Sequence, residues 1–297
     1  MIFHEIREIF NYHLGNTEIF AKHDCRNVFE KAIKDCESTG FDGLSGKKIL
    51  DLGCGQRFSF SLQCAAAGAD ATALDLNYVE PHSLPVTFYE TLRHNGLKRA
   101  GKSILRRLLF DGKYFELLSG LSGRDLKPYI KNINFIVSDP LSEKYPLPSE
   151  TSDFIASNAV LEHVENVPQF ASEVFRLLKK GGFFYGLIHN FYSISGGHNL
   201  DWAYPDTSPP KNIPPWDHIR ENRFPSWVPL NRLLPEEYQR AFSEKLKILL
   251  FSERDANHDP GGIEGEQFYT PEIAEELSQY PKELLLTRAW CIICQKK

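Results

Sequence analysis

Short runs of consecutive apolar residues, each ending in polar or acidic residues, recur along the first half of the chain. They lie at residues 49–52, 71–76, 134–139 and 153–158, and apolar residues at helical spacing lie between several of them. An unbroken apolar run of this length is typical of a strand buried on both faces, as in a parallel sheet. Alternation of such strands with helices predicts an α/β fold.

The same alternation continues to the end of the sequence. Apolar residues at helical spacing occupy residues 169–180, and Gly181 and Gly182 would end that helix before a fifth strand at 183–188. Further on, we predict a helix at 235–242, a strand at 246–251, a helix at 271–280 and a last strand at 284–295. Together these elements predict a Rossmann-like, doubly wound, mixed sheet of seven strands with helices on both faces.

Three segments do not fit a minimal version of this fold. Residues 1–43 carry two amphipathic stripes and predict an N-terminal helical lid before the main domain at 44–297. Residues 80–132 separate two predicted strands by more than a compact α/β unit needs, so we expect a helical insertion there. Residues 189–234 lack periodicity and are rich in Pro, Gly, Trp and His, which indicates a long substrate loop.

A Gly-x-Gly turn follows the first predicted strand. Asp51 lies near the end of that strand, and Gly53 and Gly55 flank Cys54. Glycine lets the backbone adopt positive φ and approach a ligand closely, as in loops that bind nucleotide-like cofactors. The second strand carries Asp75, 24 residues after Asp51, and a carboxylate at such a strand tip can accept hydrogen bonds from both hydroxyls of a ribose.

Several motifs in this order resemble those of the class I S-adenosylmethionine-dependent methyltransferases. The matching motifs are Ile49-Leu50-Asp51-Leu52-Gly53-Cys54-Gly55, Ala73-Leu74-Asp75, Ser138-Asp139-Pro140, Ala159-Val160-Leu161-Glu162-His163-Val164 and Leu177-Leu178-Lys179-Lys180-Gly181-Gly182. The resemblance covers residues 47 to about 192. One position departs from the family pattern, because Arg57 stands where a third glycine is common.

The resemblance implies that S-adenosylmethionine is the methyl donor and S-adenosylhomocysteine the product. It places Asp51 toward the methionine ammonium, Asp75 on the ribose, Asp139 on the adenine amino group and Asn158 near the sulfonium. The remaining residues implied at the cofactor are Gly53, Cys54, Gly55, Leu76 and Pro140. Asp51 and Asp75 could instead be strand-end caps, and Asp139 could open a turn at Pro140. His163 could be structural or catalytic.

The loop at 189–234 leaves a strand at the edge of the sheet where ligands of this fold class bind. Its aromatic and polar side chains suit a sugar or polyol, and we expect the acceptor to contact Tyr192, Trp202, Trp216 and Arg220. The loop also looks similar to loops of methyltransferases associated with surface-polysaccharide or glycan assembly, through Ser195-Gly196-Gly197-His198 and Pro215-Trp216-Asp217-His218-Ile219-Arg220.

Methyl transfer to a hydroxyl requires a group that removes the proton, and neutral histidine suits that role. His198 is the first candidate, His218 beside Asp217 the second, and His189 the third, although each could merely stabilise the loop. Asp201, Asp206, Asp217 and His218 match no defined ligand spacing, so we predict no metal site. The basic cluster at 98–107 indicates a solvated helix face.

We therefore predict a methyltransferase that acts on a hydroxyl of a sugar or of a glycan-linked small molecule. An amine or carboxylate acceptor, a cofactor-binding scaffold or regulatory protein, and a nicotinamide dehydrogenase remain as alternatives. The net charge of −5 and the pI near 6.1 argue against a nucleic-acid partner. The sequence contains no apolar run of transmembrane length and no signal peptide, so we expect a cytoplasmic enzyme; the oligomeric state is left open.

Overall fold

The computed structural model describes residues 16–139, 144–205 and 212–297, and the chain divides into two compact units, Met1–Pro146 and Leu147–Lys297. The first unit holds three parallel strands, β1 (Lys48–Leu52), β2 (Asp70–Asp75) and β3 (Ile133–Val137). Helix α3 (Ser59–Ala66) joins β1 to β2, and all but its first residue are buried. A helix with apolar residues on every side is expected to be buried in this way.

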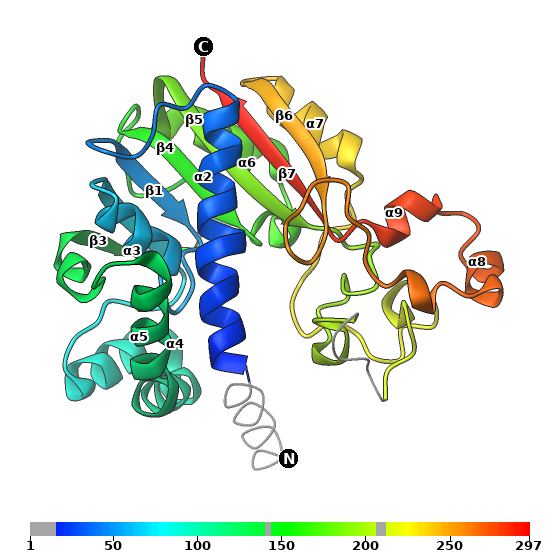
Figure 1. Ribbon diagram of the computed structural model, residues 1–297, viewed down its shortest axis with the longest axis horizontal. Helices are drawn as coiled ribbons and strands as arrows, with labels where there is room; N and C mark the ends of the chain where they lie inside the picture. The colour runs from blue at the N-terminus through cyan, green and yellow to red at the C-terminus, as the bar shows by residue number, and fades with distance from the viewer. Residues whose placement is uncertain (1–15, 140–143, 206–211) are drawn as a thin grey trace. The chain divides into compact units, whose positions relative to one another are not determined.

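A long helix covers α3 in the first unit. It spans residues 16–38 and includes a π-helical stretch, η1 (His23–Glu30), followed by α2 (Lys31–Ser38), drawn in blue in Figure 1. Phe29 packs edge-on against Phe60 of α3, with ring centroids 5.6 Å apart. The predicted lid lies partly in this helix, and its residues 1–15 are outside the described residues. Its action as a lid stays a prediction.

The segment between β2 and β3 is helical, as we predicted. It comprises α4 (Leu84–Arg106), η2 (Arg107–Asp111), α5 (Gly112–Ser122) and η3 (Lys127–Asn132), coloured cyan to green in Figure 1. Gly96 has a φ of +81° and divides α4 into two helical segments. α5 packs against η1 of the same unit.

The second unit holds β4 (Ser152–Asn158), β5 (Leu178–His189), β6 (Lys247–Arg254) and β7 (Ala289–Gln295). β4 and β5 are parallel, whereas β7 runs antiparallel to both β5 and β6. Helices α6 (Val167–Leu177) and α7 (Pro235–Ser243) pack against each other and on these strands. Phe184 of β5 stacks on Phe242 of α7 with centroids 5.0 Å apart, and Phe170 of α6 meets Phe184 edge-on.

The seven strands have the order β3-β2-β1-β4-β5-β7-β6, which confirms the predicted mixed seven-stranded sheet. Two predicted boundaries were wrong. The helix ends at Leu177, and Gly181 and Gly182 lie inside β5 near an irregularity in its pairing with β4. Residues 284–286 belong to a short helix, α9 (Lys282–Leu286), and not to the last strand.

The predicted substrate loop has only short helical turns among its described residues. These are η5 (Leu200–Trp202) and η6 (Asp217–Ile219). Two similar turns lie outside the loop: η4 (Leu161–His163) follows β4, and η7 (Glu266–Phe268) precedes α8 (Pro271–Glu276). Side chains of the loop, α8 and α9 form a second core in this unit, whose buried members are Ile194, Trp202, Trp216, Ile273, Leu277, Leu285 and Leu286. The loop is therefore held by its own apolar residues.

Candidate active site

The glycine loop after β1 is fixed by hydrogen bonds to β2. The N–H groups of Gly53 and Cys54 both donate to the carbonyl of Leu74, at 2.8 and 3.1 Å. Gly53 and Gly55 have φ values of +78° and +69°, which side chains rarely tolerate. A Cβ at Gly55 would meet no atom within 4 Å, so the backbone there borders open space. The Gly55 N–H donates to Oδ2 of Asp75 at 3.0 Å.

Two carboxylates lie at the ends of β1 and β2. Asp51 is 1% exposed and accepts a hydrogen bond from the Ser61 hydroxyl at 2.7 Å. Burial raises its pKa to about 7, and the charge of Asp75 adds to this shift, while Ser61 opposes it. The Asp75 carboxylate also accepts from the backbone and side-chain N–H groups of Asn77, at 2.8 and 2.9 Å. A cationic group such as an ammonium would favour the ionised form of Asp51.

Arg57, which replaces the usual third glycine, ties the loop to the helical insertion. Its Nε donates to Oδ1 of Asp111 at 3.1 Å, and its guanidinium lies 4.2 Å from the ring centroid of Tyr114. Arg106 donates to the same Asp111 carboxylate at 2.9 Å and to the carbonyl of Gln56 at 3.1 Å. The departure from the family pattern is thus part of an ion network that anchors the glycine loop.

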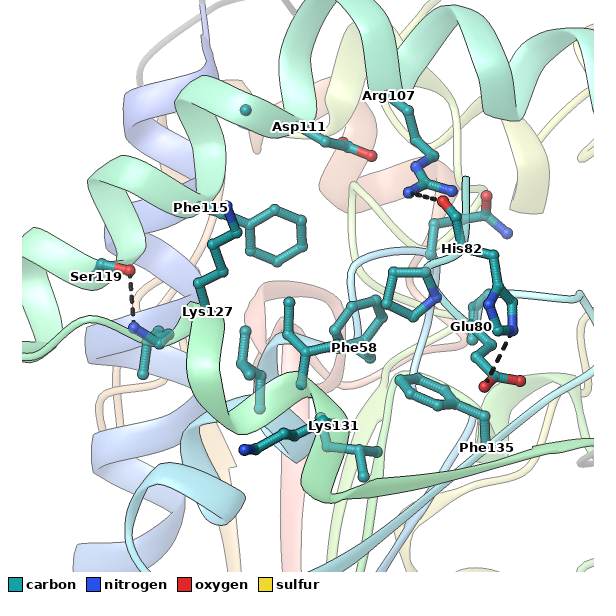
Figure 2. A pocket seen from close by; sticks show the side chains of 18 of the residues that line it. Phe58, Glu80, His82, Arg107, Asp111, Phe115, Ser119, Lys127, Lys131 and Phe135 are labelled. Carbon is teal, nitrogen blue, oxygen red and sulfur yellow. Dashed lines mark hydrogen bonds and ion pairs between the residues drawn. The ribbon is translucent and has the colours of Figure 1, made fainter. Parts of the chain in front are cut away.

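A cavity of about 1600 Å³ lies in the first unit. Its wall contains residues just after the glycine loop, Gln56 and Phe58, and Tyr78 just after β2, so it adjoins the predicted cofactor loop. Figure 2 shows Phe58 and Phe115 at its apolar wall.

The prediction that the basic cluster at 98–107 is only a solvated helix face was wrong. Arg106 forms an ion pair with Asp111. Arg107 donates to the His82 carbonyl at 2.8 Å, as Figure 2 shows.

The other predicted cofactor residues have different environments. Leu76 is 52% exposed beyond the tip of β2. Asp139 is half-buried two residues after β3, and Pro140 lies outside the described residues. Asn158 ends β4 in the second unit, and its buried Oδ1 has no hydrogen-bond partner among the described residues. An unsatisfied buried amide oxygen is a candidate acceptor for a ligand.

In the second unit, the end of β5 and two turns bring a carboxylate and three imidazoles together. We call Glu162, His163, His189 and His198 the imidazole cluster. His189 is the last residue of β5, and its Nδ1 lies 3.0 Å from Nε2 of His198. The ring of His198 meets that of His163 edge-on, with centroids 5.1 Å apart. Ligand atoms of Glu162, His189 and His198 lie within 4.8 Å of one another.

Local hydrogen bonds explain how the backbone holds this cluster. Asn231 donates through Nδ2 to the carbonyls of Leu161 and Val164, at 2.7 and 2.8 Å, and its own N–H bonds to the Glu162 carbonyl. These contacts fix η4, which carries Glu162 and His163. Tyr238 of α7 in turn donates to Oδ1 of Asn231 at 2.6 Å.

The loop that carries His198 is a tight turn. His198 has a φ of +55°, and its N–H donates to the carbonyl of Ser195. A Cβ at Gly196 would lie 2.1 Å from the carbonyl oxygen of Phe191 and 2.4 Å from that of Asn190. Only glycine fits at this position, so the sequence must keep Gly196 to bring His198 back to the end of β5.

The hydrogen bonds around His189 define its tautomer. Ser195 donates its hydroxyl proton to Oε2 of Glu264 at 2.6 Å, because a carboxylate paired with Arg288 can only accept. The Ser195 oxygen must then accept from Nε2–H of His189, which lies 2.9 Å away. Neutral His189 therefore presents an unprotonated Nδ1 toward His198. Burial lowers the pKa of His189 well below its usual range, so the neutral form holds at physiological pH.

The other members of the imidazole cluster differ in what they present. Burial lowers the pKa of His198 to about 4, with contributions from His163 and Arg288. His163 donates Nδ1–H to the Pro229 carbonyl at 2.8 Å, which leaves its Nε2 unprotonated when the ring is neutral. Glu162 is 1% exposed, and burial raises its pKa to about 8.

The structure brings together two of the three predicted base candidates. His218 instead donates Nε2–H to the Phe191 carbonyl at 2.7 Å, and burial lowers its pKa to about 4. Its neighbour Asp217 accepts from the N–H of Phe224 at 2.8 Å. Asp217 thus caps a turn and makes no hydrogen bond to His218, so we withdraw this pair as the base and its orienting group.

The predicted substrate contacts are mostly structural. Trp202 and Trp216 are 3% and 0% exposed within the second core, so neither ring face is accessible to a sugar. Arg220 pairs with Glu276, and the Tyr192 hydroxyl donates to the Arg232 carbonyl at 2.8 Å. This corrects the expectation that the two Trp rings stack on the acceptor. Aromatic residues in a polar loop are typical of a ligand surface, but here they pack on one another.

Glu162 was missed as a site residue. It stands in a motif, Leu161-Glu162-His163-Val164, that is common in the family at the entry to a helix, and the motif alone does not indicate that η4 packs against β5. A buried acidic residue in an apolar context was the available signal. The Ser195, Glu264 and Arg288 chain could not be found from spacing, because Glu264 is 69 residues from Ser195.

Comparison with known families identifies the family of the chain. The family model described as a methyltransferase domain matches residues 24–231, which is more than half of the chain. The chain therefore belongs to this methyltransferase family, and its cofactor is S-adenosylmethionine. The open backbone at Gly55 and the carboxylates of Asp51 and Asp75 are suited to that cofactor. No curated protein matches the chain.

Several solved structures are similar to the chain at low sequence identity. A S-adenosylmethionine-dependent methyltransferase from Mesorhizobium loti is 17% identical, with a TM-score of 0.46, and the match covers 89% of this chain and 98% of that one. A methyltransferase from Haloferax volcanii, solved in complex with the activator Trm112, is 14% identical, with a TM-score of 0.47 and coverages of 95% and 96%. Geranyl diphosphate C-methyltransferase from Streptomyces coelicolor A3(2) is 13% identical, with a TM-score of 0.46 and coverages of 90% and 78%.

Within residues 16–139, 144–205 and 212–297, no helix is both long enough and apolar enough to cross a bilayer.

Proposed function

We propose that this methyltransferase transfers the methyl group to a hydroxyl of a sugar or of a glycan-linked small molecule. The cofactor would be held by the glycine loop, Asp51 and Asp75 of the first unit. The acceptor hydroxyl would be bound by the imidazole cluster of the second unit. The observation that carries the proposal is this cluster of three imidazoles and a buried carboxyl group, which is suited to binding a hydroxyl and accepting its proton.

Bound S-adenosylmethionine supplies an electrophilic methyl group on a sulfonium. In the proposed step, the acceptor oxygen forms a bond to the methyl carbon while the carbon–sulfur bond breaks, and the electron pair of that bond remains on sulfur. The hydroxyl proton passes to an imidazole. We assign the proton acceptor to His163, because its Nε2 is unprotonated and the ring is half-buried.

His198, the first candidate from the sequence, is less suited to that role. Its Nε2 faces Nδ1 of His189, and its pKa of about 4 makes it a weak base at physiological pH. We propose instead that His189 and His198 orient the acceptor oxygen. This division predicts that His163→Gln mainly lowers kcat, whereas His189→Gln mainly raises the KM of the acceptor.

The test is transfer of isotope-labelled methyl from S-adenosylmethionine to carbohydrate, small-molecule, lipid and protein fractions of a cell extract. Wild type is run beside Asp75→Asn and beside Asp70→Asn, which changes an exposed carboxylate at the other end of the same strand. We expect label in carbohydrate or glycan-linked material, lost in Asp75→Asn and retained in Asp70→Asn. Label confined to protein or to amines would overturn the hydroxyl proposal.

The same experiment separates an enzyme from a scaffold. Tight binding of S-adenosylhomocysteine without transfer to any fraction, together with a stable complex with another protein, would favour a regulatory role. Label on amines that persists in His163→Gln would favour a nitrogen acceptor, since such an acceptor needs no strong base.

A further inference from the structure

We infer that Glu162, His189 and His198 form a binding site for a divalent first-row transition-metal cation. Two imidazole nitrogens and one carboxylate, all within 4.8 Å of one another, are the donor set of such sites. This donor set prefers Mn²⁺, Fe²⁺, Co²⁺, Ni²⁺ or Zn²⁺ over Ca²⁺, because imidazole is a poor ligand for the harder ion.

The buried carboxylate is the first reason for the inference. Glu162 is 1% exposed, and neither of its carboxylate oxygens has a hydrogen-bond partner in the described part of the chain. Leaving a buried polar group unpaired costs about 1–3 kcal/mol, and more for a charged group. A cation bound between Glu162 and the imidazoles would satisfy it.

The distance between the two imidazole nitrogens is the second reason. Nδ1 of His189 and Nε2 of His198 are 3.0 Å apart. Nitrogens bound at about 2.1 Å and separated by this distance subtend an angle of about 90° at the cation, the angle between neighbouring ligands of an octahedral ion. A tetrahedral ion would separate them by about 3.4 Å at the same bond length. The separation is therefore compatible with a six-coordinate ion once bonds to the cation replace the hydrogen bond between the two rings, with positions left for acceptor oxygens or water.

The hydrogen bonds behind His189 are the third reason. Its Nε2–H donates to Ser195, which donates to Glu264, and Glu264 is paired with Arg288. Histidine ligands of metals commonly donate their second N–H to such a group, which fixes the ring and leaves the other nitrogen free to bind. The ion pair with Glu264 offsets only part of the Arg288 charge, which also lowers the pKa of His189 and His198.

The role of the cation, although not its binding, rests on the proposed function. A hydroxyl bound to a divalent cation loses its proton more readily. The proton would pass to Nε2 of His163, and the oxygen would then attack the methyl carbon as the carbon–sulfur bond breaks. His189 and His198 would act as ligands, which agrees with the orienting role assigned to them.

The experiment uses the full-length protein, treated with a chelator, dialysed and titrated with Co²⁺ while its visible absorption is recorded. We expect one Co²⁺ per chain and the weak bands of a six-coordinate ion with nitrogen ligands. Glu162→Gln and His198→Ala should abolish these bands, while His94→Ala, which removes an exposed imidazole in the other unit, should not change them.

Ser195→Ala provides a graded test, because it removes only the group that receives the His189 N–H. Loss of such an outer-shell partner typically weakens metal binding by roughly 10–100-fold. Each variant must retain wild-type S-adenosylhomocysteine affinity and far-UV circular dichroism, so that a folding defect is not mistaken for a lost ligand.

Failure of this inference can be distinguished from failure of the proposed function. The absence of Co²⁺ binding in wild type, or binding unchanged in both Glu162→Gln and His198→Ala, would overturn the metal site. Methyl transfer to a hydroxyl that survives chelation would overturn the catalytic role of the ion while leaving the proposed function intact. Specific Co²⁺ binding without transfer to any hydroxyl would overturn the proposed function and support the site.

Discussion

Replacement of Asp111 tests whether the helical insertion anchors the cofactor loop. Its carboxylate accepts from Arg57 of the loop at 3.1 Å and from Arg106 of α4 at 2.9 Å, and the side chain is 9% exposed. Asp111→Ala would leave two guanidinium groups, 13% and 17% exposed, without their shared partner. Removal of one partner from a buried ion pair costs about 3–5 kcal/mol.

Because both guanidinium groups keep some contact with water, we expect a loss of about 3 kcal/mol, the lower end of that range. With an unfolding entropy of about 2.1 cal/mol/K per residue, each kcal/mol lowers the Tm of a chain of 297 residues by about 1.6 °C, so the expected decrease is about 5 °C. We also expect weaker S-adenosylhomocysteine binding, since Arg106 donates to the carbonyl of Gln56, next to Gly55.

The assays are thermal unfolding and calorimetric titration with S-adenosylhomocysteine. Glu116→Ala is the matched control, because Glu116 lies on α5 of the same insertion, is 72% exposed and pairs with exposed Lys113 at 3.3 Å. A surface pair of this kind contributes at most about 0.5 kcal/mol. If Asp111→Ala changed Tm and affinity no more than Glu116→Ala does, the anchoring network would be refuted.

Two further predictions concern a titrating carboxylate and a tight turn. Asp51 has a pKa of about 7 in the folded protein because it is buried, so its contribution to stability is greatest below pH 4 and decreases as pH rises through 7. The cofactor ammonium would bind the ionised form of Asp51, so the affinity for S-adenosylhomocysteine should increase up to about pH 7 and binding should release a proton. Asp51→Asn should remove this pH dependence. Titration calorimetry in buffers of different ionisation enthalpy measures the proton release, and a wild-type affinity that does not change with pH would contradict the prediction. Gly196→Ala should destabilise the protein by at least about 2 kcal/mol in urea unfolding, because its Cβ would lie 2.1 Å from the Phe191 carbonyl oxygen. Gly101→Ala is the control, because Gly101 lies in an exposed turn of α4 where a Cβ meets nothing within 4 Å, and it should stabilise the protein by up to about 1 kcal/mol. An equal loss of unfolding free energy in both variants would contradict this prediction.

The sequence predicts the sheet well because its signals are local. An apolar run that ends in an acidic residue and Gly-x-Gly specifies a buried strand and the turn after it, and β1 and β2 follow that pattern. The boundary at Gly181 and Gly182 was wrong, because glycine can end a helix or permit close backbone approach within a strand. A Cβ at Gly182 would lie 2.9 Å from the Lys179 carbonyl oxygen, which favours the second use here.

The candidate site could be predicted only in part, because its chemistry depends on contacts between distant segments. Asp51 and Asp75 follow from their positions at strand tips. The environment of Glu162 depends on β5 and the loop after it, and the tautomer of His189 depends on Glu264, 75 residues away. Trp202 and Trp216 show the converse, because composition could not tell a ligand-binding aromatic residue from one that packs inward.

The most direct test of the proposed hydroxyl methylation uses S-adenosylmethionine with a ¹³C-labelled methyl group, a cell extract as the source of acceptors, and NMR of the labelled product. The chemical shift of the transferred carbon distinguishes a methyl group on oxygen from one on nitrogen or carbon. We predict an O-methyl signal on a sugar or glycan-linked molecule, absent with Asp75→Asn. A signal from N-methyl or C-methyl groups alone would contradict the account.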